Sequence, residues 1–270
     1  MKEHRHVPDL DRLSVVIALI LLAYATTSFV TFPTKTLNLQ LPGFLVEVNV
    51  NFTTLVAVVV AILAAAGSDW IINGHPHLQD EIRWHHWIVP AFTAIAIGIP
   101  LGTLPVSSAW WIIFALGGVL MVGVLTAEYI SVDANDVRYA FAVMALNAVS
   151  LALFLVITTA ISGGGYRLYI LLIAVFPAAF LISARTMHLR LVTAWNIPWA
   201  FAIALIVTQV AAALFYLPLR SIQFGMITLG VLYGLITVAS NIEEKYPRRT
   251  VWIEPAVMTV VFCLIGFLIK

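Results

Sequence analysis

The sequence predicts an all-α polytopic membrane protein, with about nine transmembrane helices arranged as antiparallel helical hairpins in a single membrane domain over residues 1–270. Three observations predict this class. Hydrophobic residues make up 62% of the chain, charged residues only 10%, and the mean hydropathy is +1.02. Soluble domains carry a charge on roughly a quarter of their residues, so a soluble class is excluded. The single cysteine, Cys263, excludes a disulfide framework.

Nine apolar segments are each bounded by charged residues, prolines or glycines and are long enough to cross a membrane. A helix of about 20 apolar residues spans a hydrocarbon core roughly 30 Å thick, and its backbone must satisfy its own hydrogen bonds there. The segments cover about residues 12–33, 52–70, 87–104, 108–131, 137–161, 166–187, 195–217, 219–241 and 251–269. The first resembles a cleavable signal peptide, but its apolar run continues to Val30, which predicts a retained helix.

The basic residues predict the orientation of the chain in the membrane. Most of the 14 lysines and arginines fall in loops that share a side with the N-terminus, and basic loops stay in the cytoplasm. We therefore expect a cytoplasmic N-terminus and an extracytoplasmic C-terminus. In that orientation all seven histidines lie at the cytoplasmic face. The compact loops and the spans rich in Ala, Val and Leu suit a bacterial cytoplasmic membrane.

Residues 36–51 form the one substantial segment expected on the outer side. Apolar and polar residues alternate there on both sides of Pro42-Gly43. Alternation is typical of a strand, and a Pro-Gly pair is typical of a turn, so the segment is predicted to form a small extracytoplasmic β-hairpin. Such a hairpin would act as a lid over the helix ends, or as a gate or a docking edge for a partner strand.

Similar residues recur at the cytoplasmic starts of several predicted helices. A tryptophan precedes a proline by three residues in three places: Trp87 to Pro90, Trp195 to Pro198 and Trp252 to Pro255. Together with small residues at the ends of alternate spans, the spacing indicates duplication of a two-helix unit of about 55 residues. The alternative is that tryptophan favours the membrane interface and that proline is tolerated in the first turn of a helix.

The predicted spans contain few polar side chains at depth. None of these is charged, which argues against a proton-coupled or sodium-coupled transporter. The amides of Asn147 and Gln209 can hydrogen-bond across helices or line a cavity. Pro177 is expected to kink its helix. Gly230 and Gly234 form a GxxxG pattern, which permits a close approach of two helices.

A polar loop predicted over residues 70–86 concentrates four of the seven histidines: His75, His77, His85 and His86. Imidazoles are ligands for zinc or iron, as are carboxylates such as Glu128, which is expected nearby. The loop is therefore a candidate site for a divalent metal at the cytoplasmic face. Against this, the chain has no His-Glu-x-x-His motif, and adjacent residues on a helix point about 100° apart. The other interpretations are an interfacial segment with tryptophans at headgroup depth and a pH-sensitive contact.

The sequence favours a non-catalytic integral membrane subunit or scaffold of a larger membrane assembly, because it combines short loops and helical hairpins with no catalytic motif. Its expected partners are the lipid bilayer and other membrane subunits or further copies of itself, and a net charge of +1 gives no sign of nucleic acid. The first alternative is a transporter or channel for a neutral or amphipathic small molecule, with a cavity near Asn147, Gln209 and Pro177. The second is a metal-dependent lipid-modifying enzyme that uses the histidines.

Overall fold

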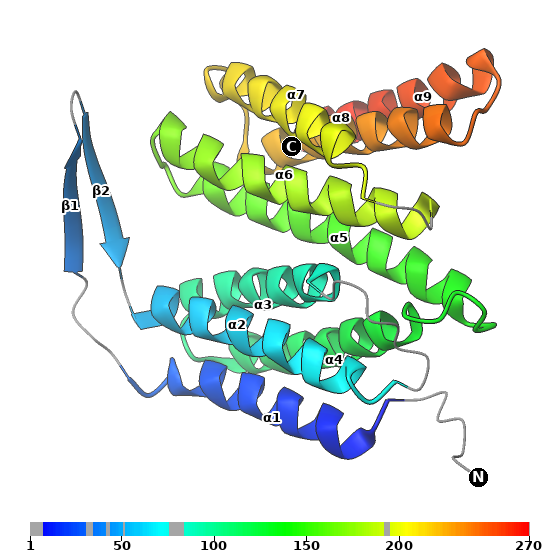
Figure 1. The fold of residues 1–270 in the computed structure, drawn as a ribbon. Helices are drawn as coiled ribbons and strands as arrows, with labels where there is room; N and C mark the ends of the chain where they lie inside the picture. Colours follow the sequence, from blue (N-terminus) through cyan, green and yellow to red (C-terminus); the bar gives the residue numbers. More distant parts are fainter. Residues whose placement is uncertain are drawn as a thin grey trace, which may run out of the picture. The chain divides into compact units, whose positions relative to one another are not determined.

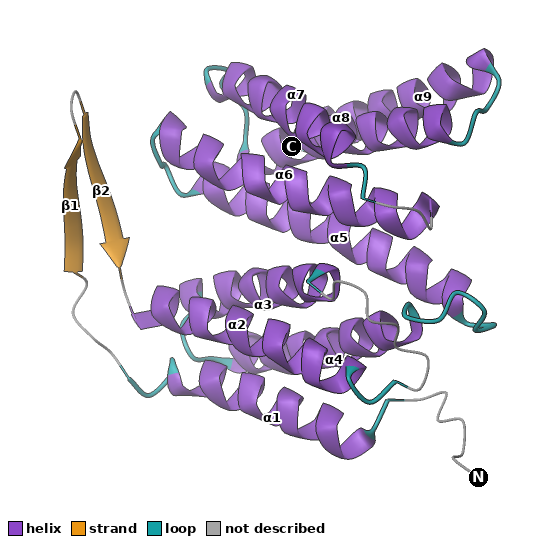
Figure 2. Ribbon diagram, in the orientation of Figure 1, coloured by secondary structure: helices purple, strands orange, loops and turns teal. Residues whose placement is uncertain are grey.

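The computed structural model describes residues 8–30, 35–41, 44–50, 52–75, 84–191 and 195–269. These residues form nine helices and one pair of strands (Figure 1; coloured by secondary structure in Figure 2). The helices are α1 (Leu10–Thr26), α2 (Phe52–Ile72), α3 (His85–Thr103), α4 (Ser108–Ile130), α5 (Tyr139–Gly163), α6 (Leu168–Leu191), α7 (Ile197–Phe215), α8 (Ser221–Glu243) and α9 (Arg248–Leu268). The strands are β1 (Lys35–Leu41) and β2 (Phe44–Val50).

Eight helices, α2 to α9, are long and apolar enough to cross a membrane, so the chain is a multi-pass membrane protein. The first helix, α1, has only 17 residues and is shorter than the predicted segment 12–33. It ends where the hydroxyls of Thr26 and Thr27 donate to backbone carbonyls one turn earlier, at 2.6 and 2.7 Å. Such bonds offer the backbone an alternative to continuing the helix. Whether α1 crosses, and so which sides the two termini occupy, stays a prediction.

The chain folds as two compact units, Met1–Ala142 (unit 1) and Val143–Lys270 (unit 2). Unit 1 holds the strands and α1 to α4, and unit 2 holds most of α5 together with α6 to α9. Within the units, helices that follow one another pack together, notably α2 on α3, α6 on α7 and α8 on α9. Figure 1 shows these pairs lying side by side. The sequence predicts that residues 1–270 form a single membrane domain. That the two units associate into one domain stays a prediction.

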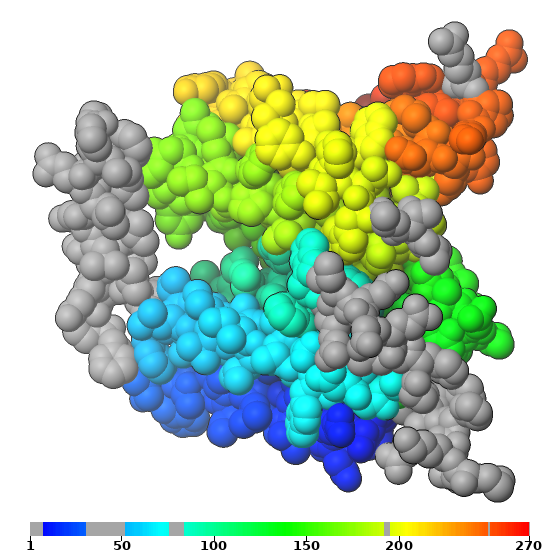
Figure 3. Space-filling view, viewed as in Figure 1, coloured from blue at the N-terminus to red at the C-terminus, as the bar shows by residue number. Residues whose placement is uncertain are grey.

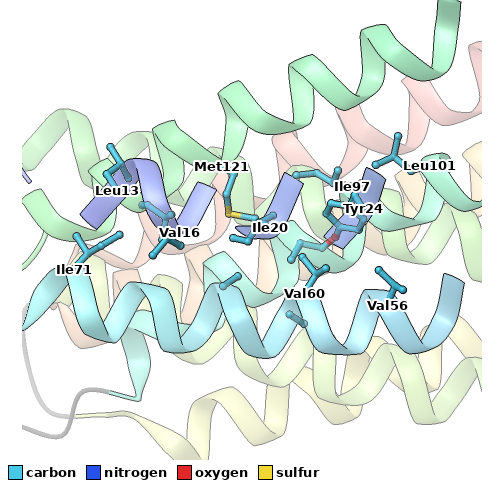
Figure 4. Close-up of a cluster of buried hydrophobic side chains, with 14 of the residues drawn as sticks. Leu13, Val16, Ile20, Tyr24, Val56, Val60, Ile71, Ile97, Leu101 and Met121 are labelled. Atoms are coloured by element: carbon cyan, nitrogen blue, oxygen red, sulfur yellow. The ribbon is translucent and has the colours of Figure 1, made fainter. Parts of the chain in front are cut away.

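The core of unit 1 is built on one face of α1. Leu13, Val16, Ile20 and Tyr24 recur every three or four residues and so lie on one side of the helix, and all four are buried. Figure 4 shows them among buried side chains from α2, α3 and α4. The Tyr24 hydroxyl donates a hydrogen bond to the carbonyl of Ala94 in α3. In lipid, close packing of this kind replaces water exclusion as the force that holds helices together.

Unit 2 is centred on α8, of which 67% of the span is buried, against 17% for α9. The two helices meet where α8 lacks side chains. A Cβ atom at Gly234 would lie 2.3 Å from the hydroxyl oxygen of Thr259, and one at Gly230 would lie 2.8 Å from Cβ of Phe262. The Thr259 hydroxyl donates to the Gly230 carbonyl at 3.1 Å. The two glycines therefore let the backbones of α8 and α9 approach closely.

The strands β1 and β2 pair antiparallel, with Lys35 opposite Val50 and Leu41 opposite Phe44. The predicted turn at Pro42-Gly43 lies outside the described residues. The side of the membrane that the strand pair occupies stays a prediction, and so does its role as a lid, a gate or a docking edge.

Candidate functional site

Three of the four predicted histidines lie near one end of α2, α3 and α4, which we call the histidine end of unit 1 (His75, His85, His86 and Glu128). The predicted loop over residues 70–86 is shorter than expected. The helix α2 continues to Ile72 and α3 already begins at His85. A hydrogen bond from the Asn73 amide to the Asp69 carboxylate, at 3.1 Å, supports the last turn of α2. His85 and His86 are thus helical, and His77 lies outside the described residues.

A buried histidine–glutamate pair forms the centre of the histidine end. Nδ1 of His86 lies 2.7 Å from Oε2 of Glu128, and the two residues are only 6% and 0% exposed. An ionised carboxylate can only accept a hydrogen bond, so with Glu128 ionised the donor is the tautomer of His86 that has its proton on Nδ1. The bond joins the first turn of α3 to the last turn of α4. Removing one partner of a buried pair leaves the other uncompensated, at a cost of about 3–5 kcal/mol.

Both members of the pair stand at the unfavourable end of their own helix. His86 lies at the N-terminus of α3 and Glu128 at the C-terminus of α4, where the helix dipoles disfavour a cation and an anion respectively. Each group meets the favourable end of the other helix only because the two helices pack together. Residues that break a local rule and are compensated by tertiary contacts are expected at functional or strained sites. This makes the pair the candidate site.

A serine of α2 fills a gap that Pro90 leaves in α3. Proline has no N–H, so the carbonyl four residues earlier, that of His86, lacks its helical donor. The buried hydroxyl of Ser68 donates to this carbonyl at 2.9 Å. The backbone of His86 is therefore held by α2 while its ring is held by α4. Sequence reasoning missed Ser68, although a proline four residues after His86 is the signal for an unpaired carbonyl.

Two more imidazoles lie close to the pair. The ring of His85 is tilted against that of His86, with ring centroids 4.0 Å apart. The ring of His75 meets that of Tyr129 edge-on, with centroids 4.7 Å apart. Tyr129 is buried beside Glu128 in the last turn of α4. The histidine end is therefore an aromatic and imidazole-rich cluster that packs the ends of α2, α3 and α4 together.

The described residues of the histidine end place an imidazole and a carboxylate within hydrogen-bond distance of each other. The Ser131 hydroxyl donates to the backbone carbonyl of Glu128 at 2.9 Å and lies 3.5 Å from its Oε2. Among the described residues, no group of three or more His, Cys, Asp or Glu side chains could hold a metal ion. His77 is outside them, so the predicted divalent metal stays a prediction. The imidazole of His86 and the carboxylate of Glu128 can share one proton in a buried site.

Unit 2 has a polar cluster at the ends of α6, α7 and α8, which we call the arginine end (Arg190, Trp199, Asn241, Glu243 and Glu244). Arg190 donates to Glu244 at 2.9 Å through Nε and to the Asn241 side chain at 2.7 Å through Nη2. Trp199 Nε1 donates to Glu243 at 2.8 Å. The carboxylates of Glu243 and Glu244 therefore tie α8 to α7 and α6.

The charges between α4 and α5 pair with their own neighbours. Arg138 Nη2 donates to Asp136 Oδ2 at 3.0 Å, and this hydrogen bond raises the pKa of Arg138. The backbone N–H of Asn135 donates to the Asp133 side chain at 2.9 Å. The carboxylates of this connection therefore stabilise their own turn.

The amides predicted within the spans face different surroundings. Asn147 is half-buried in α5, whereas Gln209 is exposed on α7. Pro177 lies inside α6, which continues through it from Leu168 to Leu191. Only one of the two amides therefore faces the interior of unit 2.

The three prolines of the recurring pattern do not occupy equivalent places. Pro198 is the second residue of α7, as a first-turn proline should be. Pro90 and Pro255 lie inside α3 and α9, so the first-turn explanation is wrong for them. The reason is that both helices begin before the predicted spans, which started at residues 87 and 251.

The tryptophans of the same pattern lie on or near the surface. Trp87 and Trp252 are exposed. Trp195 precedes α7, and its ring stacks on that of His188 with centroids 4.9 Å apart. These positions suit rings at headgroup depth.

Residues 32–269 match the DUF5656 family, which is described as a protein of unknown function, and the chain therefore belongs to this family. No curated protein and no solved structure matches the chain significantly.

Proposed function

We propose that this member of the DUF5656 family is a non-catalytic integral membrane subunit that acts as a scaffold in a larger membrane assembly. The observation that carries the proposal is the outward position of Gln209. The residue is exposed on α7, a helix with mean hydropathy 2.0. It lies about 18 Å from the start of that helix, at about 1.5 Å per residue. The next charged residue along the chain is Arg220.

An exposed amide at this depth is costly unless another molecule pairs with it. Moving an amide from water into hydrocarbon without a hydrogen bond costs about 4–8 kcal/mol. Within the part of the chain that the structure describes, Gln209 makes no hydrogen bond. Its neighbour Thr208 avoids the problem, because its hydroxyl donates to the Ala204 carbonyl of the same helix at 2.7 Å. Gln209 therefore points to a partner with a polar group at the same depth.

Three hydroxyls inside the spans of unit 2 do not create such a demand. Those of Ser150, Thr158 and Thr228 are buried and donate to carbonyls one turn earlier in their own helices, at 2.7, 2.8 and 2.9 Å. The surface of α7, yellow in Figure 3, is open to the outside of its unit in this view. An outward amide on a membrane-spanning helix is typical of an interface rather than of a lipid-facing surface.

In this function the histidine end and the arginine end hold helices together and catalyse no reaction. The His86–Glu128 pair fastens α3 to α4, and the Arg190–Glu244 pair fastens α6 to α8. Fixed helix ends keep the outward surfaces of the spans rigid, which a subunit needs for a reproducible interface.

We also propose that units 1 and 2 derive from one repeated helical unit. Ser68 of α2 donates to the His86 carbonyl of α3, and Ser183 of α6 lies 3.4 Å from the Ala200 carbonyl of α7. The equivalent residues are roughly 115 positions apart, which is about twice the period of 55 residues read from the sequence. The helix pairs of such a repeat are the antiparallel hairpins that the sequence predicts.

The topology that accompanies this function has a cytoplasmic N-terminus and an outer C-terminus, with nine crossings. Labelling of single cysteines placed at Lys2, Thr36 and Lys270 with a membrane-impermeant maleimide, in a Cys263→Ser background, would test it. Cysteines at residues 36 and 270 should be labelled from outside intact cells and cysteine at 2 only after the cells are opened. Labelling of the cysteines at both 2 and 36 from outside would contradict a crossing by α1.

The function itself is tested by mild extraction from native membranes, followed by size analysis and mass spectrometry of proteins and metals. We expect the chain in a particle larger than its own 29.6 kDa, with a fixed ratio of subunits and with that particle weakened by Gln209→Leu. A monomer that carries stoichiometric zinc or iron, lost on His86→Ala, would contradict the proposal and favour the metal-dependent enzyme.

A further inference from the structure

We infer that α7 is a self-association surface, on which two copies of this chain pair through Gln209. The inference rests on the proposed function and deepens it by naming the partner. The face is defined by Phe201, Leu205, Gln209 and Ala213, all of which are exposed. These residues are spaced by four, so they form one continuous ridge on the helix.

The ridge has the shape that helix pairing in membranes requires. Ridges of residues spaced by four interdigitate when two helices cross at about −50°, close to the −40° of small-residue pairs in membranes. Ala213 provides a small side chain one turn beyond Gln209, and Leu205 provides a large apolar one a turn before it. The helices can therefore approach closely on one side of the amide and pack apolar side chains on the other.

Symmetry makes a second copy the partner that matches Gln209. Two copies inserted in the same direction are related by a two-fold axis along the membrane normal. Residues close to that axis then meet their own counterparts at the same depth. The glutamine amide carries both an acceptor oxygen and a donor NH₂, so two facing Gln209 side chains can form reciprocal hydrogen bonds. A different protein would need a polar group at this depth by coincidence.

The helix α9 also has an exposed face in unit 2, but that face needs no hydrogen-bonding partner. The exposed residues of α9 that follow Pro255 are apolar, among them Val257, Val260, Val261 and Leu264. Nothing in that set requires a hydrogen-bonding partner, so lipid satisfies it. The comparison supplies an internal control, since both faces are exposed and only one contains an amide.

Cysteine cross-linking tests the inference directly, because the chain has one cysteine to remove. In a Cys263→Ser background, single cysteines replace residues 205, 209 and 213 on the ridge, Val207 on the buried side of α7, and Val260 on α9. Oxidation is carried out in native membranes. Disulfides form when the Cβ atoms come within about 4.5 Å. We expect a species of twice the chain mass, strongest at 209, weaker at 205 and 213, and absent at 207 and 260.

A second measurement uses variants that keep the fold. Fluorescence transfer between labelled copies in lipid vesicles is followed as the lipid-to-protein ratio rises. Gln209→Leu should weaken self-association roughly 3- to 30-fold, the range expected for membrane hydrogen bonds, whereas Gln209→Asn keeps the amide and should retain more of it. Asn147→Leu, which removes the half-buried amide of α5, serves as the matched control and should leave self-association unchanged.

The outcomes separate this inference from the proposed function. Cross-linking of residue 209 to a different protein would overturn the second copy as partner and leave the subunit function standing. An internal cross-link, or no transfer between copies in vesicles and no larger particle after extraction, would overturn both. Equal transfer for wild type and Gln209→Leu would show that the amide does not hold the pair.

Discussion

The histidine end of unit 1 and the arginine end of unit 2 do the same mechanical work with different chemistry. Each joins the ends of three helices, and in each a serine hydroxyl approaches a carbonyl of the next helix. The side chains of His86 and Glu128 are 8% and 0% exposed, whereas those of Arg190 and Glu244 are 33% and 25% exposed. Burial therefore distinguishes the His86–Glu128 and Arg190–Glu244 pairs, whose contact distances are similar, 2.7 and 2.9 Å.

This difference shows that the contact distance alone does not set how much each side-chain pair contributes to the free energy of unfolding. A half-exposed ion pair contributes about 0–1 kcal/mol, because water screens it and two long side chains lose freedom. A buried pair is costly to assemble and costly to break, because neither partner can return to water. We therefore expect unit 1 to respond far more strongly than unit 2 to the loss of a carboxylate.

The largest expected effect is that of Glu128→Ala. It leaves His86 buried without its acceptor and should lower the free energy of unfolding by about 3–5 kcal/mol. The matched variant Glu244→Ala should cost about 0–1 kcal/mol. Thermal or SDS unfolding of the purified protein in detergent, followed by circular dichroism, measures both. Equal costs would mean that burial does not distinguish the two ends.

A second comparison concerns glycines in the two units. Gly234→Ala places a methyl group against the Thr259 hydroxyl, which would lie 2.3 Å from it, and should destabilise unit 2 by about 1–3 kcal/mol. Gly123 in α4 has no atom within 4 Å of the added Cβ, so Gly123→Ala should stabilise the helix by about 0.5–1 kcal/mol. The same unfolding measurement applies. Destabilisation by both variants would show that helix packing is tight throughout.

A smaller difference in the free energy of unfolding is expected between the variants Ser68→Ala and Ser183→Ala. Ser68→Ala removes the hydroxyl that donates to the His86 carbonyl and should cost about 1–2 kcal/mol. Ser183→Ala should cost less, because the contact is longer, at 3.4 Å, and no proline blocks the helical donor of Ala200. Pro90→Ala restores the missing N–H of α3. The double variant Ser68→Ala/Pro90→Ala should therefore lose less free energy of unfolding than the two single variants lose together. Additive costs in this cycle would show that the serine does not replace the lost bond.

Much of the helical framework could be predicted from the sequence. The observed helices begin and end close to the apolar segments, because hydrophobicity and length along the chain decide whether a segment suits a membrane. The first segment was predicted too long, since its C-terminal part contains threonines whose hydroxyls bond to the preceding turn. Glu128 was expected near the histidines, but its pairing with His86 in the first turn of α3 required the packing of α3 on α4.

The sequence by itself determined that the chain is a multi-pass membrane protein and where its helices lie. Only the tertiary structure decided that Ser68 reaches the carbonyl freed by Pro90, that Glu128 is buried against His86, and that Gln209 faces outward. The physical reason is that these helices are apolar on almost every side. A water-soluble helix reveals its buried face through alternating polar and apolar residues, whereas in lipid both faces are apolar and only packing selects the inner one.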